Sequence, residues 1–116
     1  MSQYIKKLPE EPTFRKEGFN GYCYSLENSN MSITLEDSYQ KHDTYCTNVK
    51  KPSIYYVTEG EGNFIINHEE YEVKKGDIVE IPANIEFTYV GRMKLLFISV
   101  PAYTNEDFVD GRLNEG

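Results

Sequence analysis

The side chains best suited to chemistry in this chain are two histidines, His42 and His68, and two cysteines, Cys23 and Cys46. The cysteines have neither the close spacing of a redox pair nor that of a zinc site. Each is therefore expected to be a buried, reduced thiol. His68 follows Asn67 at an expected two-residue hairpin turn, where both residue types tolerate a positive φ. His42 lies in a polar stretch, where a lone histidine is expected to be solvated.

The composition indicates one globular domain spanning residues 1–116. The chain is 39% hydrophobic and 27% charged, with a net charge of −7. Its charges are scattered without a basic stripe, which argues against nucleic acid or an anionic membrane surface as a partner. No run approaches the ~18 apolar residues of a membrane span. Without an apolar stretch behind the first lysines there is no signal peptide, and a cytoplasmic location is expected.

Short apolar and aromatic runs separated by Gly, Pro, Asn and Asp predict an all-β protein with little or no helix. Met31, Ile33 and Leu35 share one face of the stretch 31–36. Glycine turns are expected at 59–62 and 91–92, between strands. Residues 1–20 are expected to be an extended lead-in, and residues 104–116 a polar tail. The expected strands cover 21–26, 31–36, 54–58, 63–67, 71–73, 78–81, 86–90 and 94–100, with a weaker candidate at 45–47.

Three stretches, "IYYVTEGEGNFII", "GDIVEIPAN" and "LLFISVPAY", resemble the cupin superfamily in content and order. The resemblance implies an antiparallel jelly-roll β-barrel. In that family a first motif supplies two histidines and a glutamate as metal ligands, and a second motif supplies a third histidine. By resemblance these positions fall near Cys46 and Asn48, on Ser53 and on Phe87. The turn glycine of the second motif is replaced by Asn84, which can still adopt a left-handed conformation.

These replacements predict a barrel without metal or another cofactor. Phenylalanine has no lone pair to offer, and first-row metal sites normally need three or more good donors. Sliding the alignment of residues 37–53 brings His42 and Thr44 to the first two ligand positions. One imidazole with Thr44, Ser53 and Phe87 still makes no metal site.

Strand alternation predicts an aromatic pocket instead. If Ser53 faces the interior, so do Tyr55 and Val57, and if Phe87 does, so does Tyr89. An apolar cavity with a few hydroxyls and an amide suits a small organic or sugar-like ligand. The alternative is that these side chains simply fill a solid barrel. The candidate pocket residues are Tyr45, Cys46, Asn48, Ser53, Tyr55, Phe87 and Tyr89.

Three functions follow from this pattern. The first is a metal-free small-molecule-binding barrel, acting as a ligand sensor or as an accessory protein. The second is a metal-independent sugar or sugar-nucleotide isomerase or epimerase, for which a tyrosine could be the acid but no base is evident. The third, least favoured by the lost ligands, is a metal-dependent dioxygenase or isomerase with a rebuilt site. By resemblance to small cupins, a homodimer is expected, paired through the strands at 21–26 and 31–36.

Overall fold

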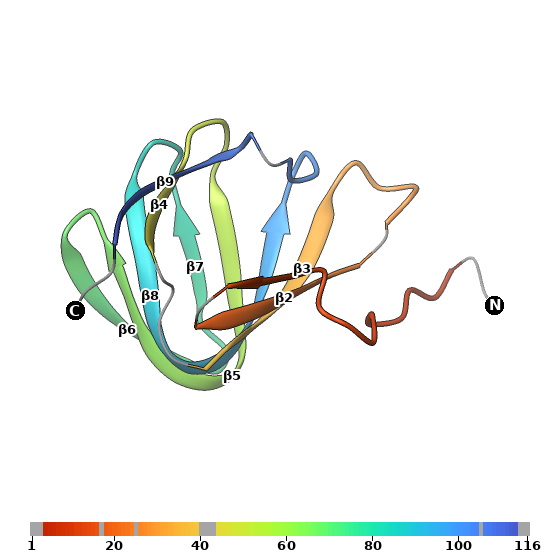
Figure 1. The fold of residues 1–116 in the computed structure, drawn as a ribbon, viewed down its shortest axis with the longest axis horizontal. Helices are drawn as coiled ribbons and strands as arrows, with labels where there is room; N and C mark the ends of the chain where they lie inside the picture. The colour runs from red at the N-terminus through yellow and green to blue at the C-terminus, as the bar shows by residue number, and fades with distance from the viewer. Residues whose placement is uncertain (1–3, 17, 25, 40–43, 105, 114–116) are drawn as a thin grey trace.

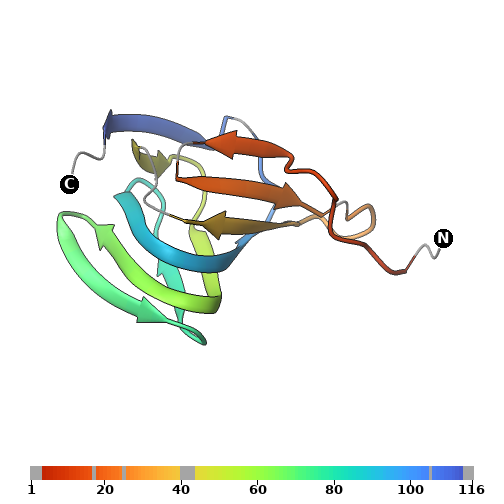
Figure 2. The ribbon, with the colours of Figure 1, turned by 60° about the horizontal axis from the view of Figure 1, so that its bottom comes forward.

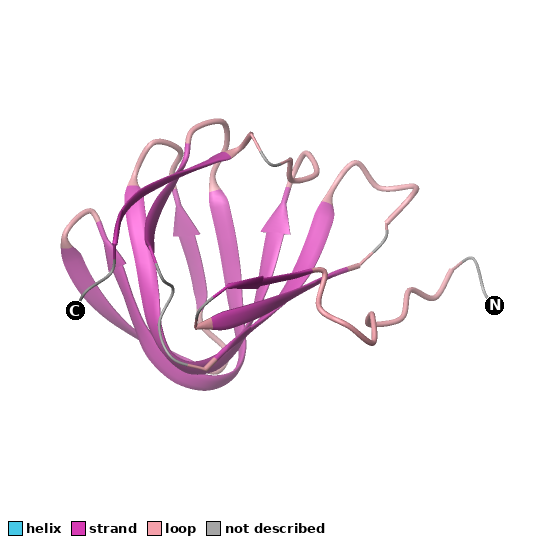
Figure 3. Ribbon diagram, viewed as in Figure 1, coloured by secondary structure: helices cyan, strands magenta, loops and turns pink. Residues whose placement is uncertain are grey.

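The computed structural model describes residues 4–16, 18–24, 26–39, 44–104 and 106–113. No helix occurs among these residues (Figure 3), and so none that could cross a membrane. The described chain forms an antiparallel sheet of nine strands that curls into a jelly-roll barrel (Figure 1). The strands are β1 (Phe14–Lys16), β2 (Phe19–Cys23), β3 (Ser32–Ser38), β4 (Thr44–Asn48), β5 (Ser53–Ile66), β6 (Glu69–Lys74), β7 (Ile78–Ile81), β8 (Glu86–Ser99) and β9 (Phe108–Leu113).

The two longest strands, β5 and β8, run through both layers of the barrel (Figure 2). In one layer, β1, β2 and β3 lead to the second half of β8, the first half of β5 and then β7. In the other layer, β9 and β4 lead to the first half of β8, the second half of β5 and then β6. The space between the layers holds the core.

The glycine-rich stretches at 59–62 and 91–92 are corners within strands, so the expectation that they are turns between strands is wrong. Gly62 pairs with Gly91 where β5 and β8 bend together. A Cβ on Gly91 would lie 2.7 Å from the Cα of Gly62, and a Cβ on Gly62 would lie 2.3 Å from the carbonyl oxygen of Val90. Only glycine allows this close approach, which lets both strands continue from one layer into the other.

The hairpin turn between β5 and β6 is confirmed. Asn67 and His68 have φ values of 50° and 71°, and the strands on either side pair from Ile66 and Glu69 onward. Asn84 also has a positive φ, of 67°. His68 is exposed at the end of this hairpin, so it contributes nothing to the interior. His42 lies outside the described residues.

Several expectations about the ends and edges of the sheet differ from the structure. Residues 14–16, expected in the lead-in, form β1, and residues 108–113 of the expected polar tail form β9. The strands at 21–26 and 31–36 were expected to be edges, but β2 lies between β1 and β3, and β3 lies between β2 and β8. Among the described strands the open edges belong to β1, β6, β7 and β9. Both unexpected strands are short and carry a phenylalanine, Phe14 or Phe108, that faces the same cavity.

Candidate functional site

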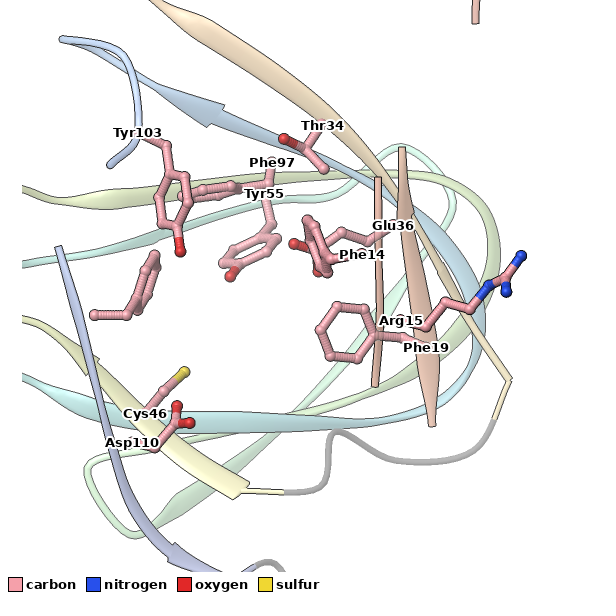
Figure 4. A pocket seen from close by; sticks show the side chains of 11 residues that line it. Phe14, Arg15, Phe19, Thr34, Glu36, Cys46, Tyr55, Phe97, Tyr103 and Asp110 are labelled. Atoms are coloured by element: carbon pink, nitrogen blue, oxygen red, sulfur yellow. The ribbon is translucent and has the colours of Figure 1, made fainter. Parts of the chain in front are cut away.

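A cavity of about 260 Å³ lies at the end of the barrel where β1, β2, β3, β4 and β9 meet (Figure 4). One part of its wall is aromatic, and the other part carries charged and small polar groups. The aromatic residues are Phe14, Phe19, Tyr55, Phe97, Tyr103 and Phe108. The remaining wall residues are Arg15, Thr34, Glu36, Cys46 and Asp110. The Arg15 side chain is 65% exposed and pairs with Glu11 at 3.1 Å, so its charge lies at the outside of the cavity.

Glu36 is the most informative group in this wall, because it is a carboxylate with only 5% exposure. It lies on β3, where Thr34, Glu36 and Ser38 alternate inward while the intervening side chains are half-buried. The Tyr89 hydroxyl donates a hydrogen bond to Glu36 Oε1. A charge-assisted bond of this kind stabilises a buried carboxylate and fixes its orientation. Glu36 is therefore positioned to accept a proton from a molecule in the cavity.

Two tyrosines with neutral hydroxyl groups, Tyr55 and Tyr89, lie near this carboxylate. The Tyr55 and Tyr89 rings lie 5.7 Å apart, and Tyr55 also stacks on Phe97 at 5.1 Å. Burial, reinforced by the negative charge of Glu36, raises the pKa of both hydroxyls well above the ordinary value. Both tyrosines consequently keep their protons at physiological pH, so each can donate a hydrogen bond or a proton but is not a ready base.

A buried ion pair holds the loop that carries Tyr103 and leads into β9 at Phe108. The Lys51 ammonium lies 2.8 Å from Asp107 Oδ2, with side-chain exposures of 12% and 1%. Lys51 also donates to the carbonyl oxygens of Pro101 and Ala102, both at 3.2 Å. This single ammonium therefore ties the connection between β4 and β5 to the start of the loop before β9, which shapes one wall of the cavity.

Asp107 should make the stability of this region depend on pH. Burial alone raises the pKa of Asp107, but hydrogen bonds from Lys51 and Thr104 outweigh it and lower the pKa below the ordinary value. The pair thus stabilises the fold above the unfolded-state pKa of about 3.9, and this contribution is lost as the pH falls through the folded-state pKa. The difference in Tm between wild type and Asp107→Asn is expected to be largest near neutral pH and to shrink below about pH 4.

Thermal unfolding followed from neutral to acidic pH measures this difference. Glu106→Gln is the matched control, since the Glu106 carboxylate is 83% exposed and pairs with Lys50 at the surface. It should change Tm little at any pH, as exposed pairs contribute little. A difference in Tm between wild type and Asp107→Asn that stays constant into strong acid would contradict the proposed role of the Asp107 charge.

The structure brings only part of the expected pocket together. Cys46 and Tyr55 lie on the cavity wall. Tyr89 is 1% exposed and lies behind the wall, where it reaches Glu36. Phe87 is 0% exposed and packs against Tyr55 and Phe108 at 5.8 and 6.4 Å, as part of the core. Tyr45 is half-buried and is not one of the wall residues.

Asn48 and Ser53, the other two expected pocket residues, are buried but lie outside the cavity wall. Asn48 Oδ1 accepts hydrogen bonds from the backbone amides of Lys50 and Lys51 at 3.0 and 2.9 Å, so it caps the connection to β5. Asn48 Nδ2 and Ser53 Oγ have no hydrogen-bond partner within the part of the chain that the structure describes.

The residues at the metal-ligand positions do not fit a divalent metal. Phe87 fills the place of one ligand with a ring, and Ser53 and Asn48 offer only neutral oxygen or nitrogen atoms. The described residues contain no group of three or more His, Cys, Asp or Glu arranged to hold a metal ion. Cys46 alone is a good donor for such an ion, which is too few for a tight site.

Elemental analysis after expression in metal-supplemented medium should accordingly find no stoichiometric iron, manganese, nickel or zinc. Phe87→His should not bind metal either, because Ser53 and Asn48 remain poor ligands. About one equivalent of any of these metals in the wild-type protein would contradict the expectation.

Several residues of the cavity wall were not predicted from the sequence. They include Glu36, Thr34 and the aromatic residues of β1, β2 and β9. The apolar residues Met31, Ile33 and Leu35 predict that the other face of this stretch points inward, but these side chains are only half-buried. The available signal was the opposite face, where Thr34, Glu36 and Ser38 alternate regularly. Polar residues that alternate along the inward face of a barrel strand indicate a cavity, since buried polar groups need hydrogen-bond partners.

The fold is that of a small β-barrel protein: a two-layered antiparallel jelly roll with an aromatic cavity at one end. The model of the Cupin domain family matches residues 50–100. The uncharacterized protein MJ1618 of Methanocaldococcus jannaschii is 31% identical over 93 residues, covering 77% of this chain and 70% of the relative. The chain belongs to the cupin superfamily.

Solved structures agree with this fold. Streptomyces PAC13 (Y89F) with uridine superposes with a TM-score of 0.87 at 24% identity, covering 97% of this chain and 93% of that chain. Pac13 is described as a unique nucleoside dehydratase, and its H42Q and Y55F variants were also solved with uridine. KdgF from Halomonas superposes with a TM-score of 0.66 at 11% identity, covering 77% of this chain and 84% of that chain.

Proposed function

We propose that this protein binds a nucleoside-like or sugar-like molecule in the cavity and removes water from it by metal-independent acid–base catalysis. The observation that carries the proposal is the buried Glu36 carboxylate, held by the Tyr89 hydroxyl at the wall of an aromatic cavity. This carboxylate supplies the base that a metal-free cupin enzyme needs. Perturbed and paired titratable groups in a cleft are the usual mark of a catalytic site.

The proposed reaction is an elimination. A Glu36 oxygen takes a proton from a carbon that lies next to a carbonyl group, where the C–H bond is acidified. The hydroxyl group on the neighbouring carbon leaves with a proton from the Tyr55 hydroxyl, which faces the cavity and stays protonated. The proton on Glu36 later returns to Tyr55. The net products are a carbon–carbon double bond and one water molecule, and the protein is regenerated.

Similarity to Pac13 supports the substrate class. The three Pac13 variants alter tyrosines at 89 and 55 and a histidine at 42, each with uridine bound. This chain also has tyrosines at positions 55 and 89, and a histidine at position 42 that lies outside the described residues. The cavity is small, and its mixture of aromatic faces and hydroxyl groups suits a single ring-bearing polar ligand.

Binding without turnover, as in a ligand sensor or accessory protein, is the second candidate. It shares the cavity but has no need of a buried carboxylate next to a proton donor. A sugar isomerase or epimerase would use the same Glu36 base without loss of the hydroxyl group. A metal-dependent dioxygenase or isomerase needs a ligand set that these residues do not provide.

The experiment that tests the proposal uses two sets of compounds. The first is uridine and other nucleosides, and the second is derivatives of these nucleosides that carry a carbonyl group on the sugar. Binding is measured by calorimetry, and mass spectrometry follows loss of one water molecule. Dehydration of a carbonyl-bearing compound at a rate that depends on the protein supports the proposal. Tight uridine binding with no product from any compound would favour the sensor, and a product of unchanged mass would favour an isomerase.

We also propose that the chain acts as a homodimer in the cytoplasm, without nucleic acid or membrane partners. Residues 4–10 extend away from the body of the molecule as an arm (Figure 1). Tyr4, Ile5 and Leu8 on this arm are 81%, 57% and 43% exposed, a pattern that suits contact with a second copy. Within the described residues neither Cys23 nor Cys46 forms a disulfide, in keeping with a reducing compartment.

Light scattering at micromolar concentrations should give twice the monomer mass. The double variant Ile5→Asp/Leu8→Asp should shift the protein toward the monomer, because it places charges on the proposed contact. A monomer mass for the wild type across this range would rule the dimer out.

A further inference from the structure

Phe14 closes one side of the cavity, and Gly21 provides the place where its ring rests. The two residues face each other in the pairing of β1 with β2. A Cβ built on Gly21 would lie 2.1, 2.4 and 2.5 Å from three ring atoms of Phe14. Any larger side chain at position 21 must therefore displace the ring. Gly21 does not have a positive φ, so glycine is needed at this position for its small size and not for its backbone freedom.

Hydrogen bonds to β2 hold the short strand β1, and with it this ring, in place. Just before β1, the Thr13 amide donates to the carbonyl oxygen of Gly21 at 2.7 Å, and Thr13 Oγ1 accepts from the Cys23 amide at 2.9 Å. Phe14 is thus a defined part of the wall, although β1 is only three residues long.

The Phe14 ring is linked through Phe19 to Tyr89, the tyrosine that holds Glu36. The Phe14 ring meets the Phe19 ring edge-on at 5.8 Å, and Phe19 meets Tyr89 at 6.0 Å. Figure 4 shows Phe14 and Phe19 on one side of the cavity, with Cys46 and Asp110 on the other. The Phe14 and Phe19 rings thus form an aromatic side of the cavity on β1 and β2, whereas the opposite side on β4 and β9 carries Cys46 and Asp110 beside the Phe108 ring.

We propose that Phe14, seated on Gly21, is the specificity-determining residue of this site, and that it packs against the flat ring of a nucleobase. This inference rests on the proposed function. The base lies on the aromatic side, and the sugar faces Glu36 and the tyrosine hydroxyls. A nucleoside is consequently bound more tightly than the free sugar, because only the nucleoside has a planar ring to stack on Phe14.

The test compares uridine with ribose by calorimetry. Phe14→Leu should weaken uridine binding about tenfold, in line with the loss of one base–aromatic contact, and leave ribose binding unchanged. Gly21→Ala should weaken uridine binding to a similar extent by moving the ring. The double variant should be no worse than Phe14→Leu alone, since a leucine lacks the ring atoms that the new Cβ would meet. Gly111→Ala is the control, because its Cβ would meet nothing closer than 3.5 Å.

The possible outcomes separate this inference from the proposed function. Unchanged uridine affinity in Phe14→Leu overturns this inference alone. The same holds if the losses of uridine affinity in Phe14→Leu and Gly21→Ala add up fully in the double variant. Binding of ribose but not uridine by the wild type also overturns it, and leaves the acid–base proposal standing. Binding of neither compound by the wild type overturns both.

Discussion

Replacing Glu36 by glutamine is expected to lower the rate of dehydration by about 10²–10⁴-fold, the usual contribution of a general base. Glutamine keeps the shape of the side chain and can still accept the Tyr89 hydrogen bond, but it cannot take a proton. Tyr89→Phe should also lower kcat, because it removes the hydroxyl group that orients the carboxylate. Steady-state kinetics with a carbonyl-bearing nucleoside measures both effects.

A matched control for this experiment is Glu80→Gln, which changes an exposed strand carboxylate on β7 in the same way. It should leave kcat and KM unchanged. If Glu36→Gln retains full turnover, Glu36 is not the base and the proposed mechanism fails. If Glu36→Gln alters only the affinity for uridine, the carboxylate binds the ligand without chemistry, as in a sensor.

Phe87→Ala is expected to destabilise the protein by about 3–5 kcal/mol, the range for deletion of a buried aromatic ring. The Phe87 side chain is 0% exposed and packs against Tyr55 and Phe108, so its removal leaves an internal void. For a domain of about this length, 1 kcal/mol corresponds to roughly 4–8 °C in Tm. Thermal unfolding should therefore show a loss of well over ten degrees.

Tyr71→Ala serves as the comparison, since Tyr71 is 47% exposed on β6 and its truncation should be nearly neutral. A loss of only a few degrees in Phe87→Ala would mean that the ring borders a hydrated space. The candidate cavity would then extend toward the metal-ligand positions of the family, and Phe87 would count among its wall residues.

The fold could be predicted from local signals that the structure preserves. The alternation along the start of β5 places Ser53, Tyr55 and Val57 inward, and all three are buried. The turn at Asn67 and His68 follows from the φ preferences of both residues. Such signals depend on neighbours in sequence, so they can be read without knowledge of the tertiary structure.

The cavity wall was harder to predict, because it depends on contacts between distant strands. Glu36 becomes a candidate base only when β8 brings Tyr89 next to it, 53 residues further along the chain. The Phe14 ring faces the cavity because β1 folds back on Gly21. A hydrophobic pattern also assigns the wrong inward face to a strand like β3, whose buried side is polar.

The aromatic content of the chain gives the cavity an optical property. With ten tyrosines and no tryptophan, tyrosine dominates the near-ultraviolet emission of the protein. Tyr55 and Tyr103 form part of the cavity wall, and the Tyr89 ring lies 5.7 Å from that of Tyr55. A pyrimidine that absorbs in the same spectral region, once inside, would quench these emitters by direct contact. The natural protein thus carries its own fluorescent reporter, and occupancy can be titrated without a label.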